Sequence, residues 1–276
     1  REVFDNTKGD KKRNLMPPTL CSQWVNIDWP RFYEFCRTEL QKKSLDERLK
    51  EAFKKNIFTT PDRHLPGMMR AGENTGGGNI GHIFGIDGTD EESLTRAMVQ
   101  GRKLLLEYER FYKKYLKGFE KMELVNTGSL LGVRETRRII GDYILNLDDF
   151  KNRAIFPDEI GRYSYPVDIH PSAPNDTEYE KFRKEFSELR HKPGESYGIP
   201  YRCLLPLKLK NVFVAGRCIS SDRYIQGSVR VMPACYITGQ AAGTSAALCS
   251  DKSILSRQLD TKKLRDTLRN NGVYLP

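Results

Sequence analysis

The strongest constraint on the fold of this chain lies between Asn211 and Leu248, where a short apolar run precedes a glycine and a long stretch of small residues. The run Asn211–Ala215, Asn-Val-Phe-Val-Ala, is typical of a strand buried on both faces. Gly216 follows it directly and permits a sharp turn or the close approach of a ligand. We therefore predict a buried strand that ends at a glycine turn, and a ligand at the carboxyl end of such a strand is typical of open α/β sheets.

The small residues that follow predict a helix with almost no side-chain volume. Pro233 suits a helix start, where its missing N–H costs nothing. Gly239 and Gly243 would lie in the helix interior, where each glycine costs about 1 kcal/mol. Something is therefore expected to approach this helix closely, either a bound group or a tightly packed sheet. The positive end of the helix dipole would attract anionic or electron-rich groups.

The rest of the chain alternates between helical and extended patterns. We expect a strand within 19–27, helices at 29–55, at 90–116 with Thr89 as cap and at 178–189, loops at 61–81 and 157–200, paired strands at 122–132 and 138–146, and a last helix at 261–270.

The composition of the chain argues against several classes of protein function. The net charge is +10, but the basic residues are mixed with acids along helix-like stretches such as 39–50, which disfavours nucleic-acid binding. No apolar run approaches the roughly 20 residues that cross a bilayer. The six cysteines never form Cys-x-x-Cys, so we expect free thiols, which suit a reducing compartment such as the cytoplasm, and no metal site. Their even number leaves disulfides open. The cytoplasm is slightly favoured, and export stays open because the chain lacks an initiating Met, which suggests a truncated start.

Three spaced motifs carry a resemblance to a known family. They are Val214-Ala-Gly-Arg-Cys-Ile-Ser220 with Gly227-Ser-Val-Arg-Val-Met-Pro233 and Gly239-Gln-Ala-Ala-Gly-Thr244, then Gly132-Val-Arg-Glu-Thr-Arg-Arg-Ile-Ile-Gly-Asp-Tyr143, and Gly198-Ile-Pro-Tyr-Arg-Cys-Leu-Leu-Pro206. Together they resemble the C-terminal portion of the FAD-dependent oxidoreductases related in fold to fumarate reductase and succinate dehydrogenase flavoproteins. Weaker agreement extends over most of the chain.

The resemblance implies an FAD site built by the last strand, the glycine turn and the helix. The residues that it implies as cofactor contacts are Gly216, Arg217, Gly227, Ser228, Val229, Arg230, Gly239, Gln240 and Gly243. The N–H groups of 227–230 would face the pyrimidine edge of the flavin, and Arg230 would stabilise the negative charge that hydride transfer places there. For Arg217 a surface arginine after a strand is the alternative.

Candidate catalytic residues are Arg230, Arg134 and His82. Arg134, with Glu135 and Arg137, suits either contact with substrate or flavin or an ion-pair network that fixes a turn. His82 and His64 could donate protons, although a single histidine is more often structural.

The family's opening dinucleotide-binding turn has no counterpart at the start of this chain. Gly76-Gly-Gly-Asn-Ile-Gly81 has the G-x-G-x-x-G spacing, but it follows no buried strand and opens no helix, so we set it aside. We expect an α/β chain with α+β character in its first part. Residues 1–195 would form a substrate-binding region with a mixed sheet and long helices, and 196–276 would complete a partial FAD-binding domain. The isolated chain should then bind FAD weakly or not at all.

The function expected is that of a fragment of an oxidoreductase that transfers hydride between a small organic molecule and the flavin. Its partners would be that substrate and the N-terminal segment of the same protein, and a homo-oligomer stays open. The alternative is a non-catalytic flavoprotein-derived domain that binds an anionic ligand such as an acidic glycan. The glycines and Arg230 favour the oxidoreductase.

Overall fold

The computed structural model describes residues 15–63 and 67–275, and the chain divides into two compact units. The first, here the N-terminal unit, contains residues 15–134, as far as they are described, together with 170–181. The second, the C-terminal unit, contains 135–169 and the residues from 182 on. Each unit has its own cluster of buried apolar side chains. His64, one of the two candidate proton donors, lies outside the described residues.

A four-stranded sheet forms the centre of the N-terminal unit, in the order β2-β3-β1-β4. Its strands are β1 (Ser22–Val25), β2 (Met68–Arg70), β3 (Gly76–Gly78) and β4 (Glu123–Thr127). The expected α/β class, with helices and strands together, is confirmed, but every pairing in this sheet is antiparallel, where we expected a mixed sheet. Strand direction depends on how the long connections return, and side-chain alternation does not encode it.

The glycine-rich stretch at 76–78 is a strand at the heart of this sheet. A Cβ at Gly78 would lie 2.5 Å from Ser22 Oγ and 2.9 Å from Nε1 of the fully buried Trp24. A Cβ at Gly76 would lie 2.8 Å from Cδ1 of Ile27. These two glycines therefore make room for side chains that cover the sheet, which accounts for the G-x-G spacing without a phosphate.

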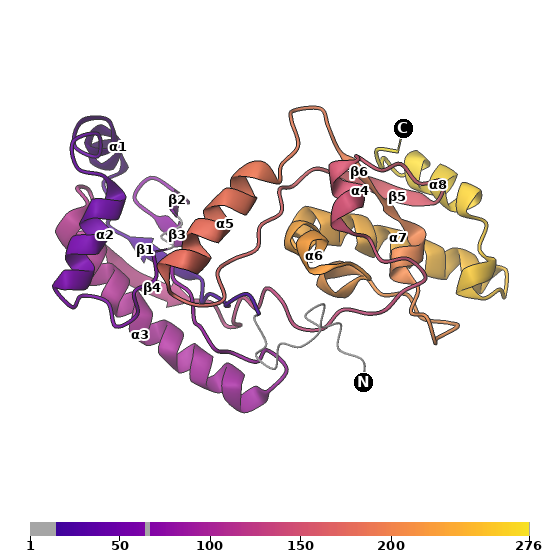
Figure 1. The fold of residues 1–276 in the computed structure, drawn as a ribbon, viewed down its shortest axis with the longest axis horizontal. Helices are drawn as coiled ribbons and strands as arrows, with labels where there is room; N and C mark the ends of the chain where they lie inside the picture. The colour runs from indigo at the N-terminus through magenta and orange to yellow at the C-terminus, as the bar shows by residue number, and fades with distance from the viewer. Residues whose placement is uncertain (1–14, 64–66, 276) are drawn as a thin grey trace. The chain divides into compact units, whose positions relative to one another are not determined.

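Three helices cover this sheet. They are α1 (Trp29–Thr38), α2 (Leu45–Lys54) and α3 (Glu91–Tyr115), the longest of the three (Figure 1). The single helix expected over 29–55 is broken because Ser44 caps α2: its hydroxyl accepts from the Glu47 N–H while the Glu47 carboxylate accepts from the Ser44 N–H. Asp90, not the expected Thr89, caps α3 by accepting from the Ser93 N–H.

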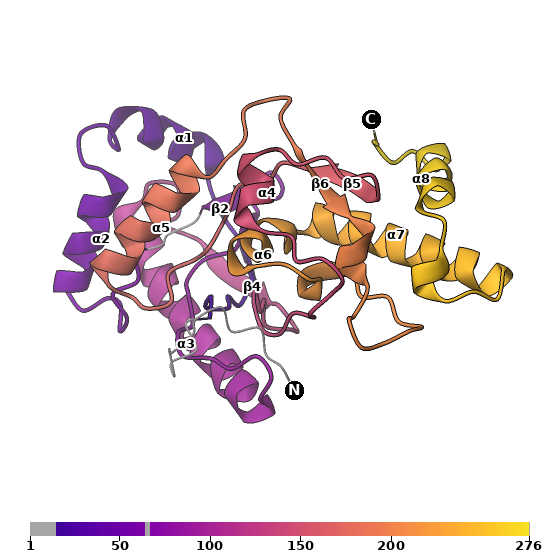
Figure 2. The same cartoon turned by 45° about the vertical axis from the view of Figure 1, so that its right-hand side comes forward.

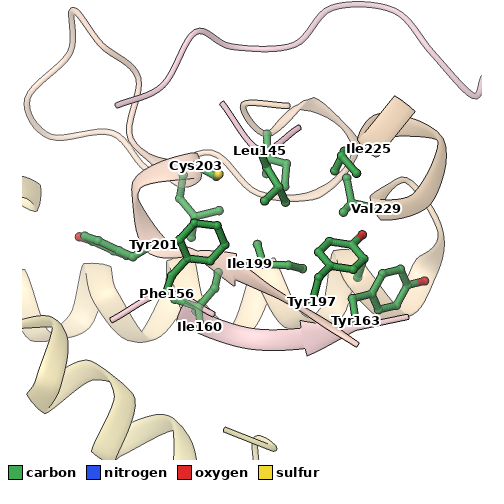
Figure 3. Packing of buried hydrophobic residues seen from close by; sticks show 14 of the residues in the cluster. Leu145, Phe156, Ile160, Tyr163, Tyr197, Ile199, Tyr201, Cys203, Ile225 and Val229 are labelled. Carbon is green, nitrogen blue, oxygen red and sulfur yellow. The ribbon is translucent and has the colours of Figure 1, made fainter. Parts of the chain in front are cut away.

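The C-terminal unit is built around β5 (Glu159–Tyr163) and β6 (Tyr197–Pro200), which pair antiparallel and are called the hairpin below, although α5 (Asp176–Glu188) lies between them in the chain. Both strands lie in the region 157–200 that we expected to be an irregular connection. Their buried side chains, with Ile225 and Val229 of α6 (Arg223–Val229), point into one core (Figure 3). The helix α7 (Met232–Asp251) runs along the hairpin in both views of the ribbon (Figures 1 and 2).

The remaining helices of the chain are short. They are α4 (Leu147–Lys151), α5 (Asp176–Glu188), α8 (Thr261–Asn270) and the 3₁₀ turns Tyr201–Leu204, Gly216–Cys218 and Ser256–Gln258. The last helix has the bounds that the sequence predicted. Residues 138–146 were expected to be a strand paired with 122–132, but β4 pairs with β1 instead, and the stretch from 138 makes only isolated bridges, Gly141 with Pro206 and Leu145 with Ser221.

The division of the chain differs from the single boundary that we expected at residue 195. Leu145, Phe156 and Ile160 pack in the C-terminal core with residues after 197, because β5 and β6 lie on opposite sides of that boundary (Figure 3). The chain therefore enters the C-terminal unit twice. All six cysteines are free thiols, and within the described residues no helix is long and apolar enough to cross a membrane.

Candidate functional site

The apolar run before Gly216 does not form a strand. Residues 211–215 have no strand assignment, and Val212 is 40% exposed. The Val214 N–H does donate to the Leu204 carbonyl at 2.9 Å, so the segment lies against the C-terminal core along one side only. The buried strand predicted here would need neighbours on both edges, and the described residues place none there.

The turn at Gly216 does have the geometry that the sequence predicted. Gly216 has a φ of +81°, in the left-handed region that favours glycine. Its N–H donates to Thr238 Oγ of α7 at 3.0 Å, which fixes the turn beside the helix. A Cβ at this position would meet only Cys235 Sγ, at 3.9 Å. Gly216 is thus required for the backbone conformation and has open space beside it.

The small-residue helix α7 is buried on one side only. Its buried positions face the hairpin and the helix α8, and they are Ala234, Thr238, Ala241, Ser245 and Cys249. Apart from the last residue, Asp251, its exposed positions are Met232, Pro233, Tyr236, Gly239, Gln240, Gly243, Ala246, Ala247 and Ser250, which we call the open face of α7. A Cβ on Gly239 or Gly243 would have no described atom within 4 Å. A hollow of about 440 Å³, lined in part by Phe213, Ala246 and Cys249, lies beside this face.

The helix α7 starts next to Pro233, as the sequence predicted. The helix begins at Met232, with Val231 as N-cap and no side chain bonded to its first N–H groups. Gly227, Ser228 and Val229, predicted to face the flavin, belong instead to the short helix α6 and are buried. A Cβ on Gly227 would lie 3.0 Å from Cγ1 of Ile169, so this glycine allows close packing within the unit.

Ser228 joins α6 to the hairpin by hydrogen bonds. Its Oγ lies 2.8 Å from the Tyr197 hydroxyl and donates to the Tyr165 carbonyl at 2.6 Å. Tyr197 is fully buried, and burial raises the pKa of its phenol far above the ordinary value. The phenol therefore stays protonated and can donate to Ser228 Oγ, which in turn donates to Tyr165.

Arg230 is held by an acid. Its Nη2 lies 2.7 Å from Asp168 Oδ2 and 2.9 Å from the Asp168 carbonyl, and its side chain is 11% exposed. The Arg230 Nε is buried without a hydrogen-bond partner among the described atoms. Arg230 is therefore a positioned cation whose charge is balanced by Asp168 and whose Nε can still donate.

Arg217, by contrast, is exposed beside the same helix. Its charge lowers the pKa of the Cys235 thiol, although burial of that thiol is the larger influence and raises the pKa overall. Gln240 is also exposed, on the open face of α7. Of the predicted cofactor residues, the accessible ones are thus Arg217, Gly239, Gln240 and Gly243, with Gly216 at the partly exposed turn.

The motif that contains Arg134 spreads over both units. Arg134, in the N-terminal unit, donates through Nη1 to the Pro17 carbonyl at 2.5 Å and to Thr19 Oγ at 3.0 Å. Glu135 begins the next part of the C-terminal unit and forms a buried ion pair with Arg138 at 2.9 Å. Arg138 also donates to the Ser221 carbonyl. Arg137 is exposed. The ion-pair network weighed for this motif exists, but Arg138, which we did not single out, is its cation.

His82 occupies a buried polar cluster in the N-terminal unit. Its Nδ1 lies 3.2 Å from Asp62 Oδ1, its Nε2 lies 2.8 Å from His170 Nδ1, and its N–H donates to Asp62 Oδ2 at 3.0 Å. The His82 side chain is 0% exposed. We identified His82 from the sequence but neither Asp62 nor His170, which lie 20 and 88 positions away and carry no local signal.

The described residues of this cluster do not offer a metal site. Both ring nitrogens of His82 already have partners, so a metal ion would have to displace one of them. Among the residues that the structure describes, no group of three or more His, Cys, Asp or Glu side chains is placed to hold a metal ion.

Comparison with known proteins identifies the family of the chain. Neither a curated protein nor a solved structure matches the chain significantly. One family model does, described as FAD dependent oxidoreductase, and it matches residues 4–268. That match spans nearly the whole chain, including α7 and the region around His82. The chain therefore belongs to the family of FAD-dependent oxidoreductases.

Proposed function

We propose that this chain is the part of an FAD-dependent oxidoreductase that carries the substrate region and the closing portion of the flavin domain. We further propose that the dinucleotide-binding turn lies on another segment, as in the fumarate reductase type of flavoprotein. The observation that carries the proposal is the open face of α7, where a methyl group added to Gly239 or Gly243 would have no neighbour within 4 Å.

A helix face with interior glycines and exposed large side chains destabilises the chain unless another group covers it. Glycine inside a helix costs about 1 kcal/mol relative to alanine, with no packing gained in return here. Met232 and Tyr236 on the same face are each 67% exposed. Closely approaching backbone is what interior helical glycines accommodate, and the first strand and helix of a dinucleotide-binding fold would supply it.

The residues present fit FAD in part. At Gly216 a positive φ and open space would allow a flavin to come near the backbone. The first turn of α7 has no side-chain cap, and Pro233 supplies no N–H, so the Met232 N–H and the positive end of the helix dipole are what would suit electron-rich atoms. Gly227, Ser228 and Val229 are buried in α6, so their part would be to hold the loop that leads into α7.

Bound FAD would supply the hydride acceptor or donor of the reaction. The first turn of α7 would stabilise negative charge on a bound flavin. Arg230 holds the start of α7 through Asp168 and adds its own positive charge nearby. Arg134 fixes Thr19, whose hydroxyl donates to the Gly81 carbonyl at 2.7 Å, and so holds the backbone next to His82.

FAD titration of the purified chain, followed by flavin absorbance and fluorescence, tests the proposal. We expect no saturable binding by the isolated chain and stoichiometric FAD in the full-length parent protein. In the parent, Gly239→Leu should abolish FAD retention because it fills the open face of α7. Lys262→Leu, an exposed change on α8, should leave retention intact.

Two results would contradict this proposal. Stoichiometric FAD in the isolated chain would mean that its site needs no further segment. A parent protein that never binds FAD, with or without the substitutions, would favour the anionic-ligand alternative, for which an acidic glycan such as heparin is the first probe.

A further inference from the structure

We propose that the exposed side of α3 binds the surface of an anionic lipid membrane. Four basic and two apolar side chains lie on this side, and all six are exposed to solvent. They form what we call the basic face of α3, namely Val99, Arg102, Lys103, Leu106, Arg110 and Lys114. The proposal goes beyond the oxidoreductase function and does not depend on FAD, because the whole face belongs to the N-terminal unit.

The helical repeat brings these six residues onto one side of α3. Each of them lies three or four positions from another, and residues at that spacing are neighbours on a helix surface. From Val99 to Lys114 the face is about 22 Å long, at 1.5 Å per residue. Ala97, Leu104 and Tyr108, on the opposite side, are buried in the core of the N-terminal unit. In both ribbon views α3 lies at the rim of its unit (Figures 1 and 2).

The cations of the basic face are not balanced by acids. Acidic residues stand among the basic ones in the sequence of α3, but the fold removes them from this face. Glu107 is buried and accepts from Thr59, and Glu109 is partly buried and pairs with Lys113 at 2.6 Å. None of the four cations of the basic face forms an ion pair with a described residue.

Four cations on one side of a helix repel one another. Arg110 and Lys114 are one turn apart, where like charges destabilise a helix. Lys114 lies over the ring of Tyr115, with its ammonium 5.8 Å from the ring centre, which stabilises this one charge. The two remaining acids of α3, Glu91 and Glu92, stand in its first turn, before the basic face begins. An anionic partner would offset the repulsion, and this pattern of charge therefore favours such a partner.

The two apolar residues indicate which anionic partner fits the face. Val99 and Leu106 are 50% and 53% exposed, lie two turns apart and have the cations on both sides of them. A nucleic acid or a sulfated glycan would neutralise the cations, but its charged backbone offers no apolar layer to these side chains. A bilayer interface offers both, because its anionic headgroups lie directly above the acyl chains. The long basic side chains can reach the headgroups while Leu106 enters the boundary beneath them.

The attachment expected is reversible and lies along the membrane surface. α3 does not have the apolar stretch that crosses a bilayer, and its other side packs in the N-terminal core. Each Lys or Arg near an anionic membrane strengthens binding about fivefold, and the attraction falls off within the screening length of the salt. Binding should therefore require anionic lipid and should weaken as the salt concentration rises.

Co-sedimentation of the purified chain with lipid vesicles tests the proposal. The vesicles contain phosphatidylcholine alone, or phosphatidylcholine and phosphatidylserine in equal parts. We expect the chain to bind only the vesicles with phosphatidylserine at about 0.1 M NaCl, and to dissociate at about 1 M NaCl, where the screening length falls to about 3 Å. Equal binding to both kinds of vesicle, or binding to neither, overturns the proposal.

A double variant, Lys103→Gln with Arg110→Gln, tests whether the basic face is the binding site. It removes two cations from the face and should weaken binding to the phosphatidylserine vesicles about 30-fold. Lys262→Gln with Lys263→Gln is the matched control, because it removes the same charge from two exposed lysines of α8 in the C-terminal unit. The control should bind nearly as the wild-type chain does. An equal loss in both double variants would mean that only the net charge of the chain attracts it to the vesicles.

Leu106→Gln separates a lipid surface from a water-soluble polyanion. It keeps every cation and removes the exposed apolar side chain, so it should weaken vesicle binding several-fold and leave retention on a heparin column unchanged. Unchanged vesicle binding in this variant would assign the basic face to a soluble polyanion and overturn the membrane proposal. Far-UV circular dichroism checks the fold of each variant, and if one does not fold, the lipid and salt dependence of the wild-type chain decides.

Discussion

The glycines of β3 and those of α7 occupy opposite environments, although both belong to glycine-rich stretches. Gly76 and Gly78 are covered by Ile27, Ser22 and Trp24 within their own unit. Gly239 and Gly243 have no described neighbour. The same absence of a side chain therefore serves two purposes: in the N-terminal unit it completes a core, and in the C-terminal unit it leaves a surface that this chain does not fill.

The largest change in stability should come from a side chain added at Gly78, inside the packed sheet of the N-terminal unit. We expect Gly78→Ala to destabilise the chain by about 1–3 kcal/mol, because its Cβ would lie 2.5 Å from Ser22 Oγ and 2.9 Å from the Trp24 ring nitrogen, inside a packed sheet. Urea unfolding followed by tryptophan fluorescence measures the change.

Gly77→Ala is the matched control for that experiment. It lies in the same strand, with nothing within 4 Å of its Cβ position. It should be neutral or slightly stabilising, because alanine reduces the entropy of the unfolded chain. Equal losses in Gly77→Ala and Gly78→Ala would mean that strand propensity, and not packing beneath Trp24, explains these glycines.

A substitution on the open face of α7 should change the stability of the chain in the opposite direction. Gly239→Ala should stabilise the isolated chain by about 0.5–1 kcal/mol, because alanine is the better helix former and meets no neighbour. Urea unfolding followed by far-UV circular dichroism detects this gain, because both tryptophans, Trp24 and Trp29, lie in the N-terminal unit. A loss of stability on Gly239→Ala would show that the face of α7 is covered within this chain, and the comparison with β3 would fail.

Sequence patterns predicted the parts of the fold that depend on local chemistry. The helix at 261–270 has its predicted bounds, and the backbone turns at Gly216, as the sequence allowed, with a positive φ. The predicted strand at 211–215 failed for a different reason. An apolar run becomes a strand only where neighbouring strands offer hydrogen bonds, and the composition of the run does not contain that information.

The candidate site residues also show that a local sequence pattern does not predict contacts between distant segments. His82 was identifiable because it follows a glycine-rich stretch, but Asp62 and His170 acquire their role only when the fold brings three distant segments together. Arg138 was overlooked beside Arg134 and Arg137, although its spacing of three from Glu135 allows an ion pair. Sequence spacing alone could have suggested that pair, but it could not have indicated which arginine is buried.

The smallest expected effect concerns pH and the helix that precedes α7. Asp222 caps α6 by accepting from the Ile225 N–H at 2.7 Å and from the Leu147 N–H at 2.9 Å. Burial raises the pKa of its carboxyl, although those N–H donors and the charge of Arg138 partly oppose the rise. The folded chain therefore binds this proton more tightly than the unfolded chain.

The sign of the pH dependence follows from that raised pKa. The contribution of protonated Asp222 is fully present below the unfolded value of about 3.9 and is lost as the pH rises through the folded value. Asp222→Asn cannot titrate, and it should lower stability overall because one N–H loses its acceptor. The stability advantage of the wild-type chain over this variant should shrink as the pH rises from 3 to 6, measured by urea unfolding. A constant difference across that range would mean that the carboxyl of Asp222 keeps its ordinary pKa, and that this end of the C-terminal unit is as open to water as the face of α7.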